Sequence, residues 1–393
     1  MTSPLAVISG AGVTGLASAY WLNRIGWRAV IIERAESLRG NGYMMGLSGP
    51  GYETAGRMGL QEKLSELSYD INENLYYDSR GRELLRLRYR VFLQNLPYLA
   101  VRRTDLVKVI HDALSEETEL RFGETVTDWQ ESEDGIDVNL TGGGTLRADL
   151  LIGADGFRSS IRPVLFEAEV SHLEALGYYF AVYDIEDRLA LDTDFLSYTE
   201  PGHLAEYYTL AGGRLAAMHV WRDKRSHLER RTDRWELLKE VSKASHPRVR
   251  EFLDLARKGD QPVIDSLTMV TLPHWSKGRV LLLGDAAHCL TLVSGQGAGM
   301  ALASAELLGR ELAAQPDIHL ALKAHEAKLR PTIEKLQQRS RRMASVFIPE
   351  SRFAFHMRNT LVRHMPKSWL GRYFSNAIRS EVLLAEGGHG FST

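Results

Sequence analysis

The feature that most constrains the fold is a glycine-rich turn between two short apolar runs near the start of the chain. The first run, Leu-Ala-Val-Ile-Ser, leads into the pattern Gly-x-Gly-x-x-Gly at Gly10, Gly12 and Gly15, and the second run ends at Glu33. This order predicts a buried strand, a helix and a second, parallel strand. The first glycine then permits a tight turn, the second admits a pyrophosphate, and the third lets helix and strand pack closely. The carboxylate of Glu33 is placed to accept hydrogen bonds from ribose hydroxyls.

A second glycine-rich segment lies far along the chain. Another apolar run ends in Gly284 and Asp285, and further glycines, including Gly295 and Gly297, lead into an apolar helix. A nicotinamide dehydrogenase needs only the first turn, whereas a flavin dinucleotide needs contacts at its adenosine, pyrophosphate, ribityl and ring portions. The N-terminus of such a helix carries about half a positive charge, which suits an anionic ring edge. Together the two segments predict a flavin site built from distant parts of the sequence.

Three other segments carry residues suited to the same ligand. Arg103 opens an amphipathic helix, where it either reaches a phosphate or ribityl oxygen or is simple surface charge. A buried strand ends in Asp155 and Gly156. Met44 and Met45 lie in a glycine-rich stretch, which indicates either a backbone passing close to a flat group or a flexible loop.

The segment 177–221 has a different character. It is rich in tyrosine and strand-forming residues and is interrupted by glycine turns, which predicts an antiparallel sheet facing the substrate. We expect the substrate pocket to be lined from this sheet, from the glycine-rich stretch and from the loop that precedes Gly295. The expected lining residues are Met44, Met45, Tyr207, His219, Trp221, Leu292 and Val293. Ordinary sheet packing is the alternative for the aromatic residues, and His219 is equally consistent with a packed core histidine, so we assign no catalytic residue.

Composition limits the class of protein. The chain has 393 residues, of which 44% are hydrophobic and 25% charged, and its net charge is −2. These values are typical of a soluble globular protein and give no general attraction to nucleic acid or acidic membranes. The single cysteine suits a reducing cytoplasm, no apolar run is long enough to span a bilayer, and no metal-ligand spacing occurs. We therefore expect a cytoplasmic monomer or homodimer with a small-molecule substrate.

The length and the order of the segments predict a divided architecture. The expected parts are a discontinuous FAD-binding domain at 1–75, 100–175 and 262–345, a substrate-binding sheet domain at 76–99 and 176–261, and a helical C-terminal segment at 346–393. The basic residues between 339 and 379 indicate either a capping helix with a solvated basic face or a surface for a membrane or partner.

The three motifs together resemble those of the single-component flavoprotein monooxygenases of the para-hydroxybenzoate hydroxylase type. That group includes tetracycline-inactivating monooxygenases and natural-product tailoring hydroxylases. The match in order and spacing covers roughly residues 4–345. The resemblance implies an α/β fold with a Rossmann-like FAD-binding domain of the glutathione-reductase type, an inserted antiparallel-sheet substrate domain and C-terminal helices.

The resemblance also implies roles for individual residues. Glu33 is expected at the adenosine ribose, Arg103 at the ribityl or phosphate portion, and Asp285 at a ribityl or pyrophosphate oxygen. The pair Asp155-Gly156 is expected near FAD, where it influences how NAD(P)H docks. The complete set of expected cofactor-binding residues is Gly10, Gly12, Thr14, Gly15, Glu33, Arg34, Arg103, Asp155, Gly156, Gly284, Asp285, Gly295, Gly297 and Ala298.

The activity implied by the resemblance is FAD-dependent monooxygenation. NAD(P)H reduces FAD, oxygen adds to form a flavin C4a-hydroperoxide, and one oxygen atom hydroxylates or epoxidises an aromatic or polyketide-like molecule. One departure keeps two alternatives open, because Thr291 and Leu292 stand where the family commonly has two prolines over the flavin ring. The alternatives are a non-redox cyclase of natural-product biosynthesis that keeps FAD as a structural element, and a flavin-dependent double-bond reductase.

Overall fold

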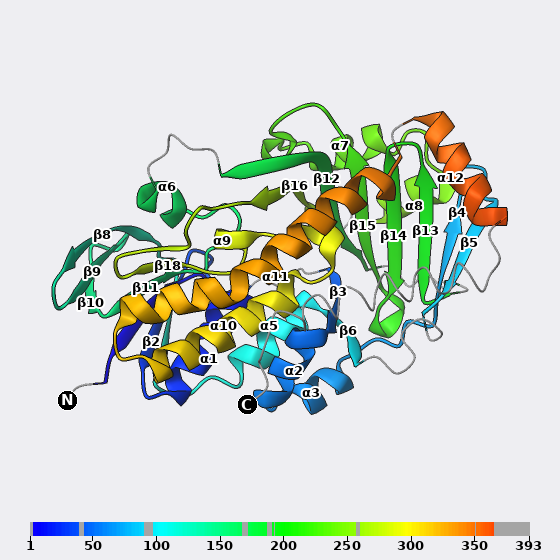
Figure 1. Cartoon of the computed structure of the whole chain (residues 1–393). Helices are drawn as coiled ribbons and strands as arrows, with labels where there is room; N and C mark the ends of the chain where they lie inside the picture. The colour runs from blue at the N-terminus through cyan, green and yellow to red at the C-terminus, as the bar shows by residue number, and fades with distance from the viewer. Residues whose placement is uncertain are drawn as a thin grey trace.

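The computed structural model describes residues 3–38, 43–89, 97–166, 172–186, 191, 193–256, 260–349 and 351–364. Figure 1 shows an elongated molecule with two large sheets at opposite ends, and a long helix, α11 (Ile318–Phe347), that passes from the first sheet towards the second. The fold is mixed α/β, as the sequence predicts.

The first sheet has six strands and contains the predicted strand–helix–strand unit. Its strands are, in spatial order, β17 (Ser276–Lys277), β18 (Val280–Leu282), β11 (Leu150–Gly153), β1 (Leu5–Ser9), β2 (Arg28–Glu33) and β7 (Thr118–Phe122). All neighbouring pairs are parallel except β17 with β18. The central strands are buried on both faces, which explains why their sequences are continuous apolar runs rather than alternating ones.

Helices cover this sheet and connect its strands. They are α1 (Val13–Arg24), α2 (Gly49–Arg57), α3 (Gln61–Glu66), α5 (Arg103–His111), α6 (Ile161–Leu165), α9 (Asp285–His288) and α10 (Gly297–Ala314). A small antiparallel sheet of β8 (Val126–Ser132), β9 (Gly135–Leu140) and β10 (Thr145–Ala148) lies at the far end of the molecule in Figure 1. The N-terminal ends of α1 and α10 follow the two glycine-rich segments, so the chain topology brings these segments to the same region.

A buried glutamate locks α2 against α10. The side chain of Glu306 is fully buried and accepts hydrogen bonds from Thr54 Oγ1 at 2.5 Å, Arg57 Nε at 2.6 Å and Arg310 Nη2 at 2.6 Å. Burial alone would raise the pKa of this carboxyl, but the hydrogen bonds from Arg57 and Thr54 hold it below its ordinary value.

The second sheet has seven strands. Their spatial order is β16 (Val263–Val270), β12 (Leu173–Ile185), β15 (Leu215–Arg222), β14 (His203–Thr209), β13 (Phe195–Glu200), β4 (Glu73–Tyr77) and β5 (Glu83–Arg88). All neighbouring pairs are antiparallel except β13 with β4. Three of its strands depart from the predicted domain boundaries, since β4 begins before residue 76, β12 begins before residue 176, and β16 lies wholly after residue 262. The division into domains itself stays a prediction.

The two faces of the second sheet have different neighbours. One face, the helix face, packs its apolar side chains against α7 (Arg234–Val241) and α8 (Pro247–Ala256). The opposite face, the inner face, packs against Met44 and Leu292 of the cofactor-side segments and against Ile348. The short ribbon of β3 (Met44–Ser48) and β6 (Tyr98–Arg102) links the two halves, and Arg102 joins Asp184 of β12 through an ion pair of 2.7 Å.

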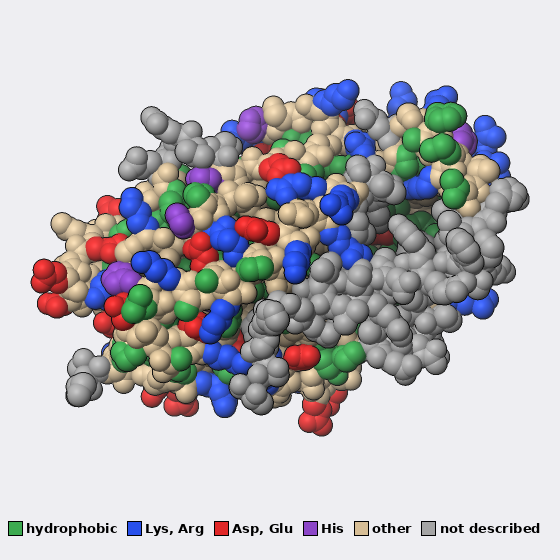
Figure 2. All heavy atoms as spheres, viewed as in Figure 1, with side chains coloured by type: hydrophobic (Ala, Val, Ile, Leu, Met, Phe, Trp, Pro, Cys, Tyr) green, Lys and Arg blue, Asp and Glu red, His purple; other side chains and the backbone are tan. Residues whose placement is uncertain are grey.

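The structure describes only the first part of the predicted C-terminal helical segment. The helix α11 continues past residue 346, and α12 (Arg352–His364) follows and packs near β5. Figure 2 shows charged residues of both signs over the face that it presents, and apolar side chains gathered on α12, where Phe353, Met357 and Leu361 are exposed. Residues 365–393 lie outside the described part. Within that part, no helix has the length and apolar character needed to cross a membrane.

Candidate active site

The first glycine turn is packed so tightly that side chains do not fit. Gly10 has a φ of +108°, and a Cβ atom there would lie 2.5 Å from the carbonyl oxygen of Ala154 on the neighbouring strand. A Cβ atom on Gly15 would lie 1.9 Å from the carbonyl oxygen of Gly10. These contacts account for the first and third glycines of the motif, while Gly12 faces more open space.

Glu33 holds this turn in place. Its Oε2 atom accepts the backbone N–H of Ala11 at 2.9 Å, and its Oε1 atom accepts that of Ala35 at the same distance. Each carboxylate oxygen has a further lone pair for a ligand hydroxyl, so these bonds are compatible with the predicted role at a ribose. Arg34 follows with an exposed side chain.

The second glycine motif lies directly against the first. Gly284 has a φ of +63°, and a Cβ atom there would lie 2.2 Å from the Thr14 hydroxyl oxygen. Asp285 begins α9 at this point, so the fold places its carboxyl group beside the N-terminal turn of α1.

An arginine and an aspartate face each other at this junction. Arg103, the first residue of α5, places its Nη2 atom 3.6 Å from the position of a Cβ atom on Gly12. Burial among protein atoms raises the pKa of Asp285, and the positive charge of Arg103 lowers it in part. The residue nevertheless has a surface that is accessible to solvent. An accessible group in such enclosed surroundings is what a ligand-binding residue requires.

Tyr43 belongs to the same cluster, and sequence reasoning did not assign it. Burial raises the pKa of its phenol, Arg103 lowers it, and Asp285 and Cys289 raise it further, which places Tyr43 among these three side chains. Its position directly before Met44 in the glycine-rich stretch is the sequence signal that would have found it.

The Asp155-Gly156 motif is a structural turn joined to the second glycine motif. Asp155 Oδ2 accepts the backbone N–H of Ser160 at 2.8 Å, at the start of α6. Gly156 has a φ of +83° and no atom within 4 Å of its Cβ position, so its face is open. The buried Arg162, also unassigned from sequence, donates to the carbonyl oxygens of Ala286 at 3.0 Å and Phe157 at 2.6 Å, and so ties this turn to α9.

The loop before α10 has an unusual backbone. Thr291 has a φ of +69°, which β-branched residues rarely adopt and which proline cannot adopt, because its ring fixes φ near −65°. Gly295 follows with a φ of +63°. Proline therefore does not fit at position 291 on the backbone path that this loop follows.

The end of this loop is held against the glycine-rich stretch. Gln296 donates from Nε2 to Ser48 Oγ at 3.2 Å, and a Cβ atom on Gly51 would lie 2.3 Å from the Cα atom of Gly299. Gly297 and Ala298, at the N-terminus of α10, are partly exposed. The side chain of Val293 lies outside the described part of the structure.

The predicted pocket residues divide between two sides of β3. Met44 packs against the inner-face cluster that contains Tyr208, whereas Met45 packs against the core of the first sheet. Leu292 packs against the inner-face cluster that contains Leu204 and Val220. Met44 and Leu292 therefore approach the inner face from the cofactor-side segments.

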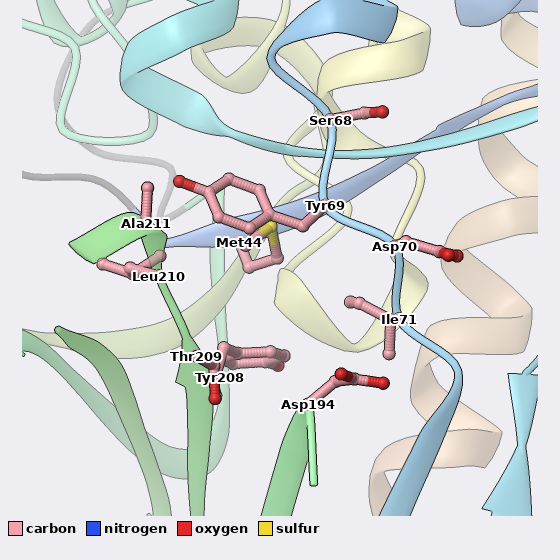
Figure 3. A pocket seen from close by; sticks show the side chains of 10 residues that line it. All are labelled: Met44, Ser68, Tyr69, Asp70, Ile71, Asp194, Tyr208, Thr209, Leu210 and Ala211. Atoms are coloured by element: carbon pink, nitrogen blue, oxygen red, sulfur yellow. The ribbon is translucent and has the colours of Figure 1, made fainter. Parts of the chain in front are cut away.

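A pocket of about 340 Å³ opens at the end of β14 beside Met44. Figure 3 shows Tyr69, Tyr208 and Met44 around it, with Asp194 at its side. The complete lining is Met44, Ser68, Tyr69, Asp70, Ile71, Asp194, Tyr208, Thr209, Leu210 and Ala211.

The structure corrects the placement of Tyr207, His219 and Trp221. All three lie on the helix face, packed with α7 and α8, and none lines this pocket. Because side chains alternate along a strand, a one-residue error in register moves a whole set to the opposite face. The inner-face residues are instead Glu206, Tyr208 and Met218, which the sequence analysis did not assign.

His219 is a packed core histidine, the alternative that the sequence left open. Its ring nitrogens face the Tyr183 hydroxyl at 2.8 Å and His203 Nε2 at 3.1 Å. Burial lowers the pKa of His219 well below its ordinary value, so the ring is neutral.

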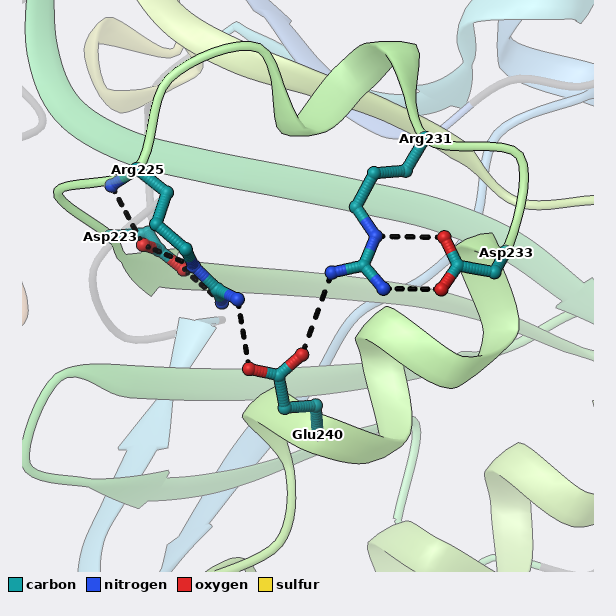
Figure 4. A network of polar contacts seen from close by, with 5 residues as sticks. All are labelled: Asp223, Arg225, Arg231, Asp233 and Glu240. Atoms are coloured by element: carbon teal, nitrogen blue, oxygen red, sulfur yellow. Dashed lines mark hydrogen bonds and ion pairs between the residues drawn. The ribbon is translucent and has the colours of Figure 1, made fainter.

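A network of ion pairs fixes the loop between β15 and α7. Glu240 of α7 pairs with Arg225 at 2.9 Å and with Arg231 at 3.6 Å, as Figure 4 shows.

The described residues fit a dinucleotide flavin. The glycine positions provide backbone that a ligand can approach, Thr14 and Gly284 bring the two motifs together, and Arg103 and Asp285 supply a cation and a carboxylate at the junction. A parallel sheet with this turn, joined to a second sheet whose inner face meets the cofactor-side loops, defines an FAD-dependent oxidoreductase.

The comparison with known proteins identifies the family. A model of the FAD binding domain family matches residues 4–339, and the chain belongs to this family. The chain is 30% identical over 345 residues to uncharacterized protein Rv1260 of Mycobacterium tuberculosis, covering 84% of this chain and 91% of that protein. It is 27% identical to a flavin-dependent monooxygenase of Legionella longbeachae, covering 84% and 86% of the two chains.

Solved structures share the fold. The tetracycline destructase Tet(51) aligns over 100% of both chains with a TM-score of 0.84 and 24% identity. Klebsiella pneumoniae HpxO, in complex with FAD and uric acid, aligns over 97% of both chains with a TM-score of 0.81 and 21% identity. Because the chain belongs to the FAD binding domain family, FAD is the cofactor of this protein.

Proposed function

We propose that this protein is an NAD(P)H- and oxygen-dependent FAD monooxygenase that hydroxylates or epoxidises an aromatic or polyketide-like small molecule. The observation that carries this proposal is the meeting of Met44 and Leu292 with the inner face of the second sheet. This meeting gives the cofactor side of the molecule an adjoining apolar and aromatic region, where a substrate can lie against a bound ring.

The residues of the junction have distinct tasks in this proposal. Arg103 binds an anionic portion of the dinucleotide, and Asp285 accepts hydrogen bonds from its hydroxyl groups. The N-terminal end of α10 stabilises negative charge on a reduced ring. FAD, when bound, supplies electron transfer from NAD(P)H and the reaction with molecular oxygen. The apolar side chains of Met44, Met218 and Leu292 orient the substrate and exclude water.

The names of similar proteins support the substrate class. Tet(51) is a tetracycline destructase, HpxO has been solved with uric acid, and a relative in Sarocladium schorii, 26% identical over 398 residues, is the FAD-dependent monooxygenase asL4. Polycyclic, heteroaromatic and natural-product substrates therefore belong in the first screen.

The test is anaerobic reduction of the FAD-loaded protein by NADPH and NADH, followed by mixing with oxygen in the presence of a candidate substrate. We expect bleaching of the flavin by one nicotinamide, reoxidation by oxygen, and a product heavier by one oxygen atom. Bound FAD that neither nicotinamide reduces, together with an isomeric product, would favour a non-redox cyclase. The positive φ of Thr291 in the ring-side loop is the observation that keeps this second candidate open.

A product that gains two hydrogens without consuming oxygen would instead indicate a double-bond reductase. The matched control is Asp137→Asn, because Asp137 forms an exposed ion pair with Arg147 in the small sheet of β8, β9 and β10. This variant should behave as the unmodified protein does, whereas Asp285→Asn should retain less FAD.

A further inference from the structure

Glu206 occupies the centre of the inner face. It lies on β14, the middle strand of the sheet, and pairs in register with Met218 on one side and Ser197 on the other. Direct cross-strand partners share a face, and the same row continues to Val182 and Tyr76. Apart from Ser197 and Asn74, which hydrogen-bond to each other, Glu206 is thus a carboxyl group in the middle of an apolar and aromatic surface.

Three tyrosine side chains interact with this carboxyl group, and a fourth, that of Tyr98, interacts with two of them. They are Tyr76 of β4, Tyr89 after β5, Tyr98 of β6 and Tyr208 of β14. Glu206 raises the pKa values of Tyr76, Tyr89 and Tyr208, and Tyr98 acts on those of Tyr89 and Tyr208. Burial is the largest cause of the raised pKa of each of the four phenols, and it raises the pKa of Tyr98 to about 12. All four phenols are therefore neutral. Arg358 of α12 also acts on Tyr76. We call Glu206 and the four tyrosines the tyrosine chamber.

The hydrogen bonds of Glu206 within the protein are long. Its Oε2 atom accepts the Tyr208 hydroxyl at 3.5 Å, and its Oε1 atom accepts that of Ser197 at 3.4 Å. An ionised carboxylate usually accepts from hydroxyl groups at about 2.5–2.7 Å. Both carboxylate oxygens therefore accept only weak hydrogen bonds from the protein. Solvent does not replace those bonds, because only 4% of the residue is exposed. Burial accordingly raises the pKa of Glu206 to about 7, and the hydrogen bonds from Ser197 and Tyr208 lower it only in part.

The tyrosine chamber adjoins the described pocket and the cofactor side. Tyr208 lines the pocket of Figure 3 and also contacts Glu206. Met44 packs with the cluster of Tyr208, and Leu292 packs with the cluster of Leu204, two residues that flank Glu206 on the same face of β14. A molecule held between these two side chains would have Glu206 as the acidic group on the sheet beneath it.

We propose that Glu206 is the substrate-recognition base of this enzyme, which binds a phenolic or enolic hydroxyl group of the substrate and accepts its proton. This inference rests on the proposed function, because it names the substrate class for the same site. The hydroxyl hydrogen moves to a carboxylate oxygen of Glu206, and the electron pair of the broken O–H bond stays on the substrate oxygen. No oxidant or reductant takes part in this step, and the proton returns to the substrate oxygen after the product forms.

A hydroxyl group suits this site better than an ammonium group. Near neutral pH a carboxyl group with a pKa of about 7 exists in both protonation states, which is the condition for efficient proton exchange. The phenols of Tyr76, Tyr89 and Tyr208, which interact with Glu206, can donate hydrogen bonds to a substrate oxygen that becomes negative. Ionisation also enriches the ring carbons next to the hydroxyl in electrons, as electrophilic oxygen transfer requires.

The experiment uses the oxidised, FAD-loaded protein without reductant. The probes are 4-nitrophenol, whose phenol and phenolate have different absorption bands, with 4-nitroaniline and 4-nitroanisole as isosteric comparisons. At pH 7.5, where most of the Glu206 carboxyl group is ionised, we expect the unmodified protein to bind nitrophenol roughly tenfold to a hundredfold more tightly than nitroanisole. This preference should weaken as the pH falls below about 7, and it should be absent from Glu206→Gln at every pH.

The matched control is Glu200→Gln. Glu200 is also a buried glutamate on a central strand, but it bonds to His203 and Ser245 on the opposite face. This variant should keep the preference for nitrophenol over nitroanisole. A shorter carboxylate, Glu206→Asp, guards against a folding defect in the glutamine variant, since it should keep this preference with weaker binding.

Three results would overturn the proposal. They are an unchanged preference for nitrophenol over nitroanisole in Glu206→Gln, preferential binding of 4-nitroaniline by the unmodified protein, and no binding of any probe to it. The readout needs neither NAD(P)H nor oxygen. If oxygen transfer failed while the preference for nitrophenol still depended on Glu206, the proposed function would be wrong and the role of Glu206 would stand.

Discussion

Gly284 lies against Thr14 so closely that a Cβ atom on the glycine would approach the threonine hydroxyl oxygen to 2.2 Å. Two motifs that are distant in sequence therefore meet through one contact. This contact places Asp285 beside the first turn of α1, and it makes the cofactor site depend on the relative position of β18 and α1.

Replacing Gly284 with alanine should abolish stable FAD binding. The positive φ alone costs on the order of 1–2 kcal/mol for a residue with a side chain, and Thr14 must also move. The measurement is the FAD content of the purified protein and its thermal midpoint. Gly123→Ala is the control, because Gly123 has a φ of +74° and no atom within 4 Å of its Cβ position. Equal FAD loss in both variants would show that the contact with Thr14 is unimportant.

Replacing Arg103 with glutamine should weaken FAD binding by roughly tenfold to a hundredfold. A hydrogen bond to a charged group contributes about 1.5–3 kcal/mol, and Arg103 is the cation at the junction with Gly12 and Asp285. Fluorescence titration of the apoprotein with FAD measures the change. Arg121→Gln, which removes an arginine of β7 that pairs with Glu119, should leave FAD affinity unchanged. An affinity within twofold of normal for Arg103→Gln would contradict its assignment.

Replacing Glu306 with alanine should lower the free energy of unfolding by about 3–5 kcal/mol. The substitution leaves Arg57 and Arg310 without their shared carboxylate and opens a gap between α2 and α10. Denaturant unfolding measures this difference. Glu53→Ala removes an exposed partner of the same Arg57 and should cost less than 1 kcal/mol. Similar losses in the two variants would argue against a special role for the buried carboxylate.

Much of the fold follows from local patterns in the sequence. The runs around Gly10 and Gly284 predict buried strands correctly because a parallel strand that is covered on both faces is apolar throughout. The contact between Thr14 and Gly284 is not predictable in this way, since it depends on how β11 separates β1 from β18 in the sheet.

The substrate side was less accessible to prediction. Tyr207, His219 and Trp221 alternate along the same strands with Glu206, Tyr208 and Met218, so the two sets lie on opposite faces of the sheet. Composition alone does not say which of the two sets packs against the helices. The tyrosine-rich character of the segment was informative about the sheet but not about its faces. Glu206 escaped notice because a lone acidic residue in a strand is usually solvent-exposed.

Stability should fall as pH rises from about 4.5 to about 7 through the contribution of Glu206. The unfolded chain loses this proton near pH 4.5, whereas the folded protein keeps it up to about pH 7, so the folded state is penalised by on the order of 3 kcal/mol above that window. Glu206→Gln should remove this contribution and raise the unfolding free energy at pH 8. Glu119→Gln, at an exposed site, should not change the pH profile. An unaltered profile in Glu206→Gln would mean that its carboxyl group titrates normally.

Buried His325 should make the protein sensitive to acid. Burial lowers the pKa of its ring from 6.5 to about 4, while the Ser304 carbonyl oxygen lies 3.1 Å from Nε2. Below pH 6.5 the unfolded state binds a proton that the folded state refuses, so stability falls by on the order of 3 kcal/mol between pH 6.5 and 4. Chemical unfolding across this range should show a shallower decline for His325→Gln than for His319→Gln, whose histidine is exposed. Parallel declines in the two variants would rule out His325 as the source.

The positive φ of Thr291 has a consequence for protein engineering. A single Thr291→Pro substitution cannot recreate the proline-containing loop of similar enzymes, because the existing backbone does not accept the pyrrolidine ring. Chimeras between this chain and such enzymes must therefore exchange the whole connection from Cys289 to Gln296 as one cassette. Residue-by-residue transfer would pass through intermediates in which the old path is blocked and the new one is not yet formed.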